Sequence, residues 1–203
     1  MKKLIAALTI SALSFTFCTV ALAQIPGFNR GGSSPSASTD LMESFIESNK
    51  HNLEALIHFA TAFDLKDQVE LLKAEKLALE SGLIDQTTIE KTRLSTKDAR
   101  DAFETRIADQ PELTAEGRES YQKGLVSYFL AIATARDVVS AGSNFERPSL
   151  SNLLGAAKNA KSSAYVIREV PGYLKGLQSG AAMLLTYAKS NNIEVPDNAT
   201  SLL

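Results

Sequence analysis

Apolar side chains follow a helical period along most of the chain, and their densest run lies at residues 124–135. This stretch reads GLVSYFLAIATA and holds no charged residue. At about 100° per residue, one helix face here collects Tyr121, Leu125, Tyr128, Phe129, Ile132 and Val139. Much of the remaining surface is filled by Val126, Leu130, Ala133 and Val138. A helix that is apolar nearly all round is normally buried on all sides, so the pattern predicts a buried central helix over about residues 119–141.

The rest of the chain repeats this period with a polar face, and capping or helix-breaking residues separate the segments. The predicted helices cover residues 40–63, 65–81, 86–108, 119–141, 150–170 and 172–190. The segment 86–108 is largely charged and has only a narrow apolar seam, which is typical of an outer helix. No strand-like alternation occurs. We therefore predict an all-α fold, a single bundle of about six helices around the central one.

Particular residues mark the expected helix ends. Asp64 is predicted to cap the helix at 65–81, and Thr114 to start the central helix. Pro171 with Gly172 is predicted to separate the last two helices, because proline lacks an N–H and glycine weakens a helix. Asn191 and Asn192 are expected to end the last helix.

Small residues recur every four positions in the last two predicted helices. One row consists of Gly172, Gly176 and Gly180, and the other of Ala156, Ala160 and Ala164. A glycine inside a helix costs ~1 kcal/mol relative to alanine, so a packing reason is expected. We predict a tight antiparallel hairpin of 150–170 against 172–190. The alternative is a homo-oligomer contact through the glycine row.

The first residues have the three parts of a secretory signal. Residues 1–3 (Met-Lys-Lys) precede an uncharged, largely apolar run, which ends at residues 21–23 (Ala-Leu-Ala). We expect a signal peptide at 1–23 with cleavage after Ala23 and export to the periplasm; secretion to the outside is the alternative. The only cysteine, Cys18, lies in this segment, so we expect no disulfide in the mature chain.

The remaining 180 residues are predicted to form three parts. Residues 24–39 are a flexible Gly/Ser/Pro-rich leader, residues 40–192 the helical bundle domain, and residues 193–203 an irregular C-terminal tail. With 19 basic and 23 acidic side chains, this part is slightly acidic, which argues against nucleic acid as a partner. The 12 uncharged residues at 124–135 would span only ~18 Å of a bilayer's ~30 Å core, so no transmembrane segment is predicted in the mature chain.

The sharpest polar constellation lies on one side of the first helix: Glu47, His51, Glu54 and His58. Imidazoles and carboxylates at this spacing of 4, 3 and 4 could bind zinc or copper. However, the stripe lies almost opposite the apolar face around Leu56 and is expected to point to water. Glutamate and histidine four residues apart are also common on helix surfaces. We predict no metal and no cofactor, and we keep this stripe as the candidate site of an enzyme or metal binder.

Residues 120–123 (Ser-Tyr-Gln-Lys) match the Ser-x-x-Lys signature of penicillin-recognising enzymes. The partner motifs Lys-Thr-Gly and Ser-Asp-Asn are missing. The sequence also lacks the signatures of serine hydrolases, zinc proteases, P-loop proteins and dinucleotide-binding proteins. We predict no enzymatic activity and assign no catalytic residue.

Three functional hypotheses follow. The leading one is a non-catalytic periplasmic helical-bundle protein that acts through protein–protein interaction, as an adaptor or chaperone-like factor with a protein partner. The alternative is a carrier of a small apolar ligand in the bundle core around residues 125–132, which requires a cavity of ~300 Å³ or more. The third is an enzyme or metal binder that uses the stripe from Glu47 to His58.

Overall fold

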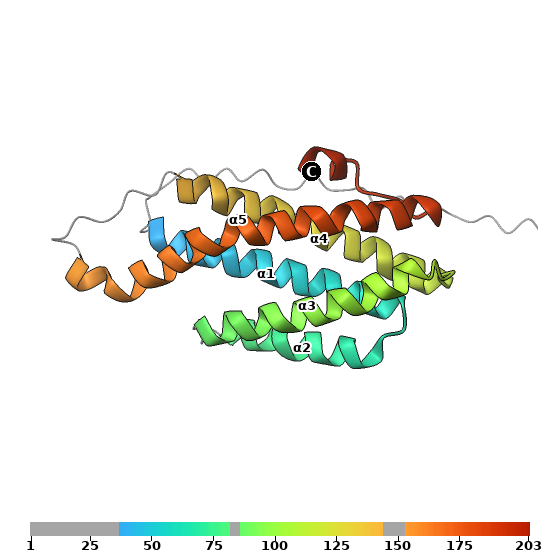
Figure 1. The fold of residues 1–203 in the computed structure, drawn as a ribbon, viewed down its shortest axis with the longest axis horizontal. Helices are drawn as coiled ribbons and strands as arrows, with labels where there is room; N and C mark the ends of the chain where they lie inside the picture. The colour runs from blue at the N-terminus through green and yellow to red at the C-terminus, as the bar shows by residue number, and fades with distance from the viewer. Residues whose placement is uncertain (1–36, 82–85, 144–152) are drawn as a thin grey trace, which may run out of the picture. The chain divides into compact units, whose positions relative to one another are not determined.

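A computed structural model describes residues 37–81, 86–143 and 153–203, all of them within one compact unit that spans residues 34–203. These residues form α-helices and one short 3-10 helix, and no strand occurs among them. The elements are α1 (Ala37–Ala62), α2 (Lys66–Glu80), α3 (Gln86–Ala108), α4 (Ala115–Ser143), α5 (Leu153–Ser190) and η2 (Ala199–Leu202) (Figure 1). The predicted all-α bundle is therefore confirmed. The predicted signal peptide with Cys18 and the leader up to residue 36 lie outside the described residues.

The described part holds five α-helices, whereas the sequence predicts six, because α5 runs from Leu153 to Ser190 through Pro171. The predicted hairpin of 150–170 against 172–190 is therefore wrong. Pro171 and Gly172 are exposed, whereas Val170 and Leu177 on either side of them are buried. Burial of the flanking apolar side chains outweighs the one hydrogen bond that the proline removes.

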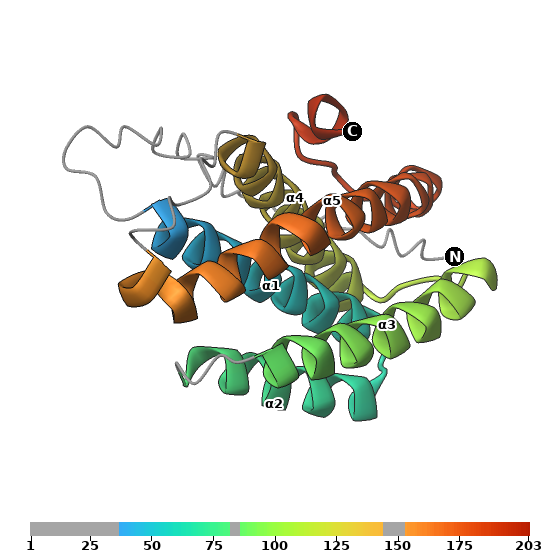
Figure 2. The ribbon, with the colours of Figure 1, turned by 60° about the vertical axis from the view of Figure 1, so that its left-hand side comes forward.

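The structure does not confirm a central position for the predicted helix at 119–141, which lies within α4. In Figures 1 and 2, α1 lies in the middle, with α2 and α3 on one side of it and α4 and α5 on the other. Helix α1 contacts all four of these helices. One broad face of α4 is buried, but Val126 on the other is 41% exposed. The apolar surface of α4 is thus larger than the part of it that the neighbouring helices bury.

The predicted end residues Thr114 and Asn192 lie at helix ends in the structure, whereas Asp64 has a different role from the one predicted. The Thr114 hydroxyl accepts a hydrogen bond from the Gly117 amide at 3.0 Å and starts α4 as predicted. Asn192 has a φ of 53° and lies just past the end of α5. Asp64 has a φ of 56° and ends α1, and α2 begins after Leu65 with no side-chain cap. The prediction that Asp64 caps the second helix is wrong, because this residue adopts the left-handed turn that closes the helix before it.

The core consists of two clusters of buried apolar side chains. The larger is built around Phe59, whose ring lies 4.9 Å from that of Tyr121 and 5.7 Å from that of Phe103. The smaller lies towards the start of α1 and contains Phe45 and Ile89. The segment 193–203 packs on the larger cluster through Ile193 and η2. The space between the two clusters is where the candidate site lies.

Two buried tyrosines of α4 join it to α5. Tyr121 donates a hydrogen bond to the carbonyl oxygen of Leu184 at 3.0 Å, and Tyr128 donates one to that of Leu177 at 2.9 Å. Among the described helices, α4 alone is long and apolar enough to cross a membrane, and half of its most apolar window is buried within the bundle.

Candidate functional site

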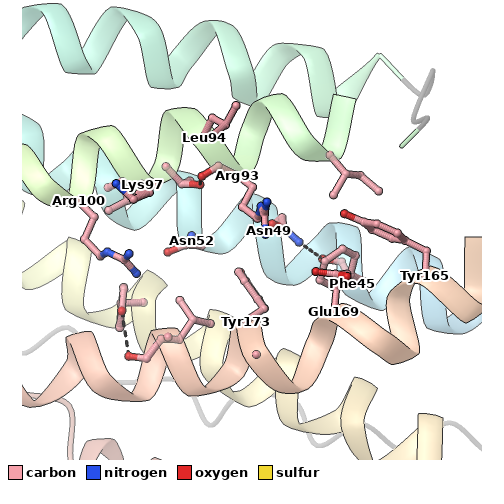
Figure 3. A pocket seen from close by; sticks show the side chains of 17 residues that line it. Phe45, Asn49, Asn52, Arg93, Leu94, Lys97, Arg100, Tyr165, Glu169 and Tyr173 are labelled. Atoms are coloured by element: carbon pink, nitrogen blue, oxygen red, sulfur yellow. Dashed lines mark hydrogen bonds between the residues drawn. The ribbon is translucent and has the colours of Figure 1, made fainter. Parts of the chain in front are cut away.

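A pocket of about 520 Å³ opens between α1, α3 and α5 (Figure 3), and the buried Tyr128 of α4 also lines it. Its lining combines Phe45 and Ile89 of the smaller core cluster with Leu56 and Leu177 of the larger one. The pocket therefore lies where the two clusters meet. Its volume falls within the ~300–1,000 Å³ that is usual for small-ligand sites.

Aromatic rings form much of the pocket wall: Phe45, Tyr128, Tyr165 and Tyr173. The rings of Phe45 and Tyr173 meet edge to face with their centres 5.6 Å apart. The Tyr173 hydroxyl donates a hydrogen bond to the Ser48 carbonyl at 3.2 Å. Burial raises the pKa of Tyr128 and of Tyr173 well above that of a free tyrosine. Both hydroxyls therefore stay neutral at physiological pH and serve the wall as fixed hydrogen-bonding groups.

The predicted glycine row gives the pocket part of its room. Gly172 and Gly176 line it, and a Cβ atom on Gly172 would meet nothing within 4 Å. On Gly176, the nearest atom to a Cβ would be Nη1 of Arg100, 3.8 Å away. Gly180 is buried, and its Cβ would lie 2.6 Å from the Tyr128 hydroxyl oxygen. The row thus faces α3, α4 and the pocket of its own chain.

Two asparagines of α1, Asn49 and Asn52, also line the pocket. Asn49 donates its side-chain N–H to the Phe45 carbonyl at 2.8 Å. Asn52 is only 7% exposed, lines the pocket, and makes no side-chain hydrogen bond to a residue that the structure describes (Figure 3). Among the described residues no fully buried side-chain N or O atom lacks a hydrogen-bond partner, so the amide of Asn52 is reached from the pocket. Asn52 is therefore a group with which a polar part of another molecule in the pocket can form a hydrogen bond.

Three basic residues of α3 line the pocket: Arg93, Lys97 and Arg100. Their spacing of four and three residues places them on one face of the helix. Glu169 is the only acidic residue in the described lining, and its carboxylate accepts a hydrogen bond from Arg168 at 2.9 Å. The lining thus carries more positive than negative charge.

The predicted stripe from Glu47 to His58 lies elsewhere, on the far side of α1. His51 and Glu47 approach each other at 3.5 Å, whereas Glu54 pairs with Lys76 of α2 at 3.6 Å. Burial lowers the pKa of His58, partly offset by Glu54. No three metal-binding side chains come together among the residues that the structure describes.

Each of the two Ser-x-x-Lys side chains, Ser120 and Lys123, contacts a different residue. The Ser120 hydroxyl donates to the carbonyl oxygen of His58 at 2.9 Å, and Lys123 pairs with Glu119 at 2.7 Å. A serine nucleophile needs a base within hydrogen-bonding reach, and here each of the two side chains has a structural partner. Both residues therefore have structural contacts that account for them: Ser120 joins α4 to α1, and Lys123 forms an ion pair within α4.

Sequence reasoning missed the pocket, although some signals for it were present. The small-residue row on α5 predicts close helix packing, whereas at Gly172 and Gly176 it leaves open space. The basic residues of α3 belong to the segment predicted as an outer helix, and nothing in their pattern indicates a pocket. Asn52 gave no signal, because an asparagine on a helix is unremarkable until its burial is known.

The chain matches no model of a protein family, and it matches neither a curated protein nor a solved structure.

Proposed function

We propose that this chain is a non-catalytic, exported binding protein whose pocket between α1, α3 and α5 holds a small, largely apolar ligand. The observation that carries the proposal is Asn52, an unpartnered amide that is 7% exposed and lies in a space of about 520 Å³. Aromatic walls would contribute apolar contact, and a few polar groups would orient the ligand, which is the usual division of roles in such sites.

The chemistry of the lining favours binding over catalysis. Among its described members there is no histidine, cysteine or serine, and the one carboxylate, Glu169, is paired with Arg168. Two tyrosines of the lining, Tyr128 and Tyr173, have hydroxyl pKa values that burial raises well above that of a free tyrosine. These groups are poor candidates for proton transfer or nucleophilic attack near neutral pH.

Export to the periplasm remains part of the proposal and is supported by the sequence of residues 1–23 alone. A ligand-binding bundle in that compartment would meet small molecules that cross the envelope. Determining the first residue of the protein recovered from the periplasmic fraction would test the cleavage after Ala23.

A plugged pocket tests the binding function. Gly176→Leu places an apolar side chain into the pocket from a helical glycine whose Cβ would meet no atom closer than Nη1 of Arg100, 3.8 Å away. The matched control is Ser179→Leu, which adds the same side chain to an exposed position of α5. Both variants are compared with the parent chain for binding of the uncharged fluorescent probe N-phenylnaphthylamine.

We expect the parent chain and Ser179→Leu to enhance the probe's fluorescence, and Gly176→Leu to lose most of this enhancement while its melting temperature is retained. Equal binding by all three proteins, or binding by none, would contradict the proposed site. Native mass spectrometry of the protein taken gently from cells adds a second readout, since a bound molecule appears as extra mass that Gly176→Leu lacks.

A protein partner is the second candidate function, and the exposed leucines of α2 and α3 favour it. Leu77 is 66% exposed, Leu94 is 58% exposed and Leu71 is 42% exposed. Replacement of Leu71 and Leu77 by lysine should release a partner captured by cross-linking in cells, whereas Gly176→Leu should not. An adaptor or chaperone-like role requires that first result.

A further inference from the structure

The charged side of the pocket is built by a single helix. Arg93, Lys97 and Arg100 line the pocket from α3, and Arg93 and Arg100 point away from this helix across the pocket (Figure 3). The guanidinium of Arg100 reaches across, since its Nη1 would lie 3.8 Å from a Cβ atom on Gly176. A cation therefore stands at the edge of the same open space that the glycine row leaves.

These cations are available to a ligand. Arg93 forms no ion pair with a residue that the structure describes. Lys97 pairs with Asp101 at 2.8 Å and Arg100 with Glu104 at 3.5 Å, and all four of these side chains are more than a third exposed. Exposed pairs of this kind contribute roughly 0–1 kcal/mol, so an anion in the pocket can replace either carboxylate at small cost.

The inner end of the pocket has the opposite character. Leu56 and Leu177 are buried there, and the rings of Phe45 and Tyr173 form an apolar wall. Asn52 also lines the pocket and can both donate and accept hydrogen bonds without adding charge. The pocket thus offers cations on the α3 side and apolar surface toward α1 and α5.

The separation of the cations from the apolar surface indicates which class of ligand the pocket fits. Resting on the proposed binding function, we infer that the pocket binds a single-chain amphipathic anion, with its carboxylate, sulfonate or phosphate group against Arg93 and Arg100 and its apolar body between the aromatic rings. Arginine is suited to this role because its planar guanidinium donates two parallel hydrogen bonds to such a group.

Three ligands of one chain length separate charge from apolar contact. Dodecanoate, dodecanol and dodecylamine share the same tail and carry a negative, a neutral and a positive head near neutral pH. Binding of each to the protein obtained from expression of the full chain is measured by calorimetry, below the concentration at which they form micelles. We expect dodecanoate to bind about tenfold or more tightly than the other two, which corresponds to one charge-assisted hydrogen bond.

A matched pair of variants locates the preference. Arg93→Gln/Arg100→Gln removes two positive charges from the pocket side of α3, and Lys91→Gln/Arg106→Gln removes two from exposed positions of the same helix that do not line the pocket. The first variant should bind dodecanoate and dodecanol about equally, and the second should keep the preference of the parent chain. Added salt should weaken dodecanoate binding more than dodecanol binding.

The outcomes separate this inference from the binding function itself. Equal binding of the three ligands by the parent chain would overturn the anionic class and leave a general apolar pocket in place. Binding of none of them, together with no binding of N-phenylnaphthylamine, would overturn both. Association with phosphatidylglycerol vesicles that persists in Gly176→Leu, without binding of free dodecanoate, would overturn the pocket as the site of anion recognition and point to a surface that binds lipid.

Discussion

At the scale of single residues, the contact between Gly124 and Phe59 shows how little room the larger core cluster leaves. A Cβ atom on Gly124 would lie 2.6 Å from Cε1 and 2.7 Å from Cδ1 of the Phe59 ring. Phe59 is fully buried and held by the rings of Phe103 and Tyr121. Both helices therefore need the glycine in order to approach each other.

We expect Gly124→Ala to lower the free energy of unfolding by about 1–3 kcal/mol, because overpacking forces neighbouring side chains out of place. Denaturant titration followed by circular dichroism measures this. Gly172→Ala is the control: its Cβ meets nothing within 4 Å, so it should be neutral or stabilise by up to ~1 kcal/mol. Equal effects of the two substitutions would contradict this view of the core.

Gly180 and Tyr128 form a second close pair, and here the clash involves one atom only. A Cβ atom on Gly180 would lie 2.6 Å from the Tyr128 hydroxyl oxygen but 3.6 Å from the ring carbon that bears it. We expect Gly180→Ala to be destabilising in the parent chain and neutral or stabilising in Tyr128→Phe, where the oxygen is gone. The double-mutant cycle should give a coupling of roughly 1–3 kcal/mol, and additive effects would show that the clash is relieved in another way.

At the scale of elements, α5 contains a proline that the helix tolerates. Pro171 has no N–H for the carbonyl oxygen of Ile167, and its ring crowds that oxygen. We expect Pro171→Ala to raise the free energy of unfolding by about 1–3 kcal/mol with unchanged helix content. Pro196→Ala is the control, because this proline lies outside the helices and its carbonyl still accepts from Ala199. A gain for Pro196→Ala but none for Pro171→Ala would contradict the assigned cost.

The course of α5 also marks the limit of what the sequence predicts about elements. The narrow apolar seam of the segment predicts α3 with the bounds seen in the structure, 86–108. At Pro171 and Gly172 the local preference for a break is equally clear, yet buried residues on both sides keep the helix continuous. The local sequence determines how unfavourable a continuous helix is at these residues. Whether the helix continues depends on the tertiary contacts of the residues on either side.

At the scale of the whole molecule, the pocket depends on distances between helices that no single segment encodes. Tyr128 lines the pocket and is 2% exposed, so the same helical position serves both a packed core and a ligand wall. The sequence predicts that such residues are buried. It does not predict that α3 and α5 stand far enough apart to leave about 520 Å³ between them, because that spacing is set by how each of them packs on α1.

The alkaline limit of stability is a property of all five tyrosines together. Each has a raised pKa, and burial is the main cause in every case. An unfolded tyrosine ionises near pH ~10, so above that pH the unfolded chain has released protons that the folded chain still holds. The stability contributed by these groups is therefore complete below pH ~10 and is lost as the pH rises above it.

We expect tyrosinate absorbance and loss of helix to appear in one transition above pH ~10, rather than tyrosinate first. Tyr121→Phe removes a fully buried hydroxyl. It should lower stability at neutral pH through the lost hydrogen bond to Leu184, and reduce the fall of stability above pH ~10 by up to ~1.4 kcal/mol per pH unit. Tyr165→Phe, at a partly exposed position, should change this slope less. Ionisation of the buried tyrosines in the intact helical state would instead mean that water reaches their hydroxyls without unfolding.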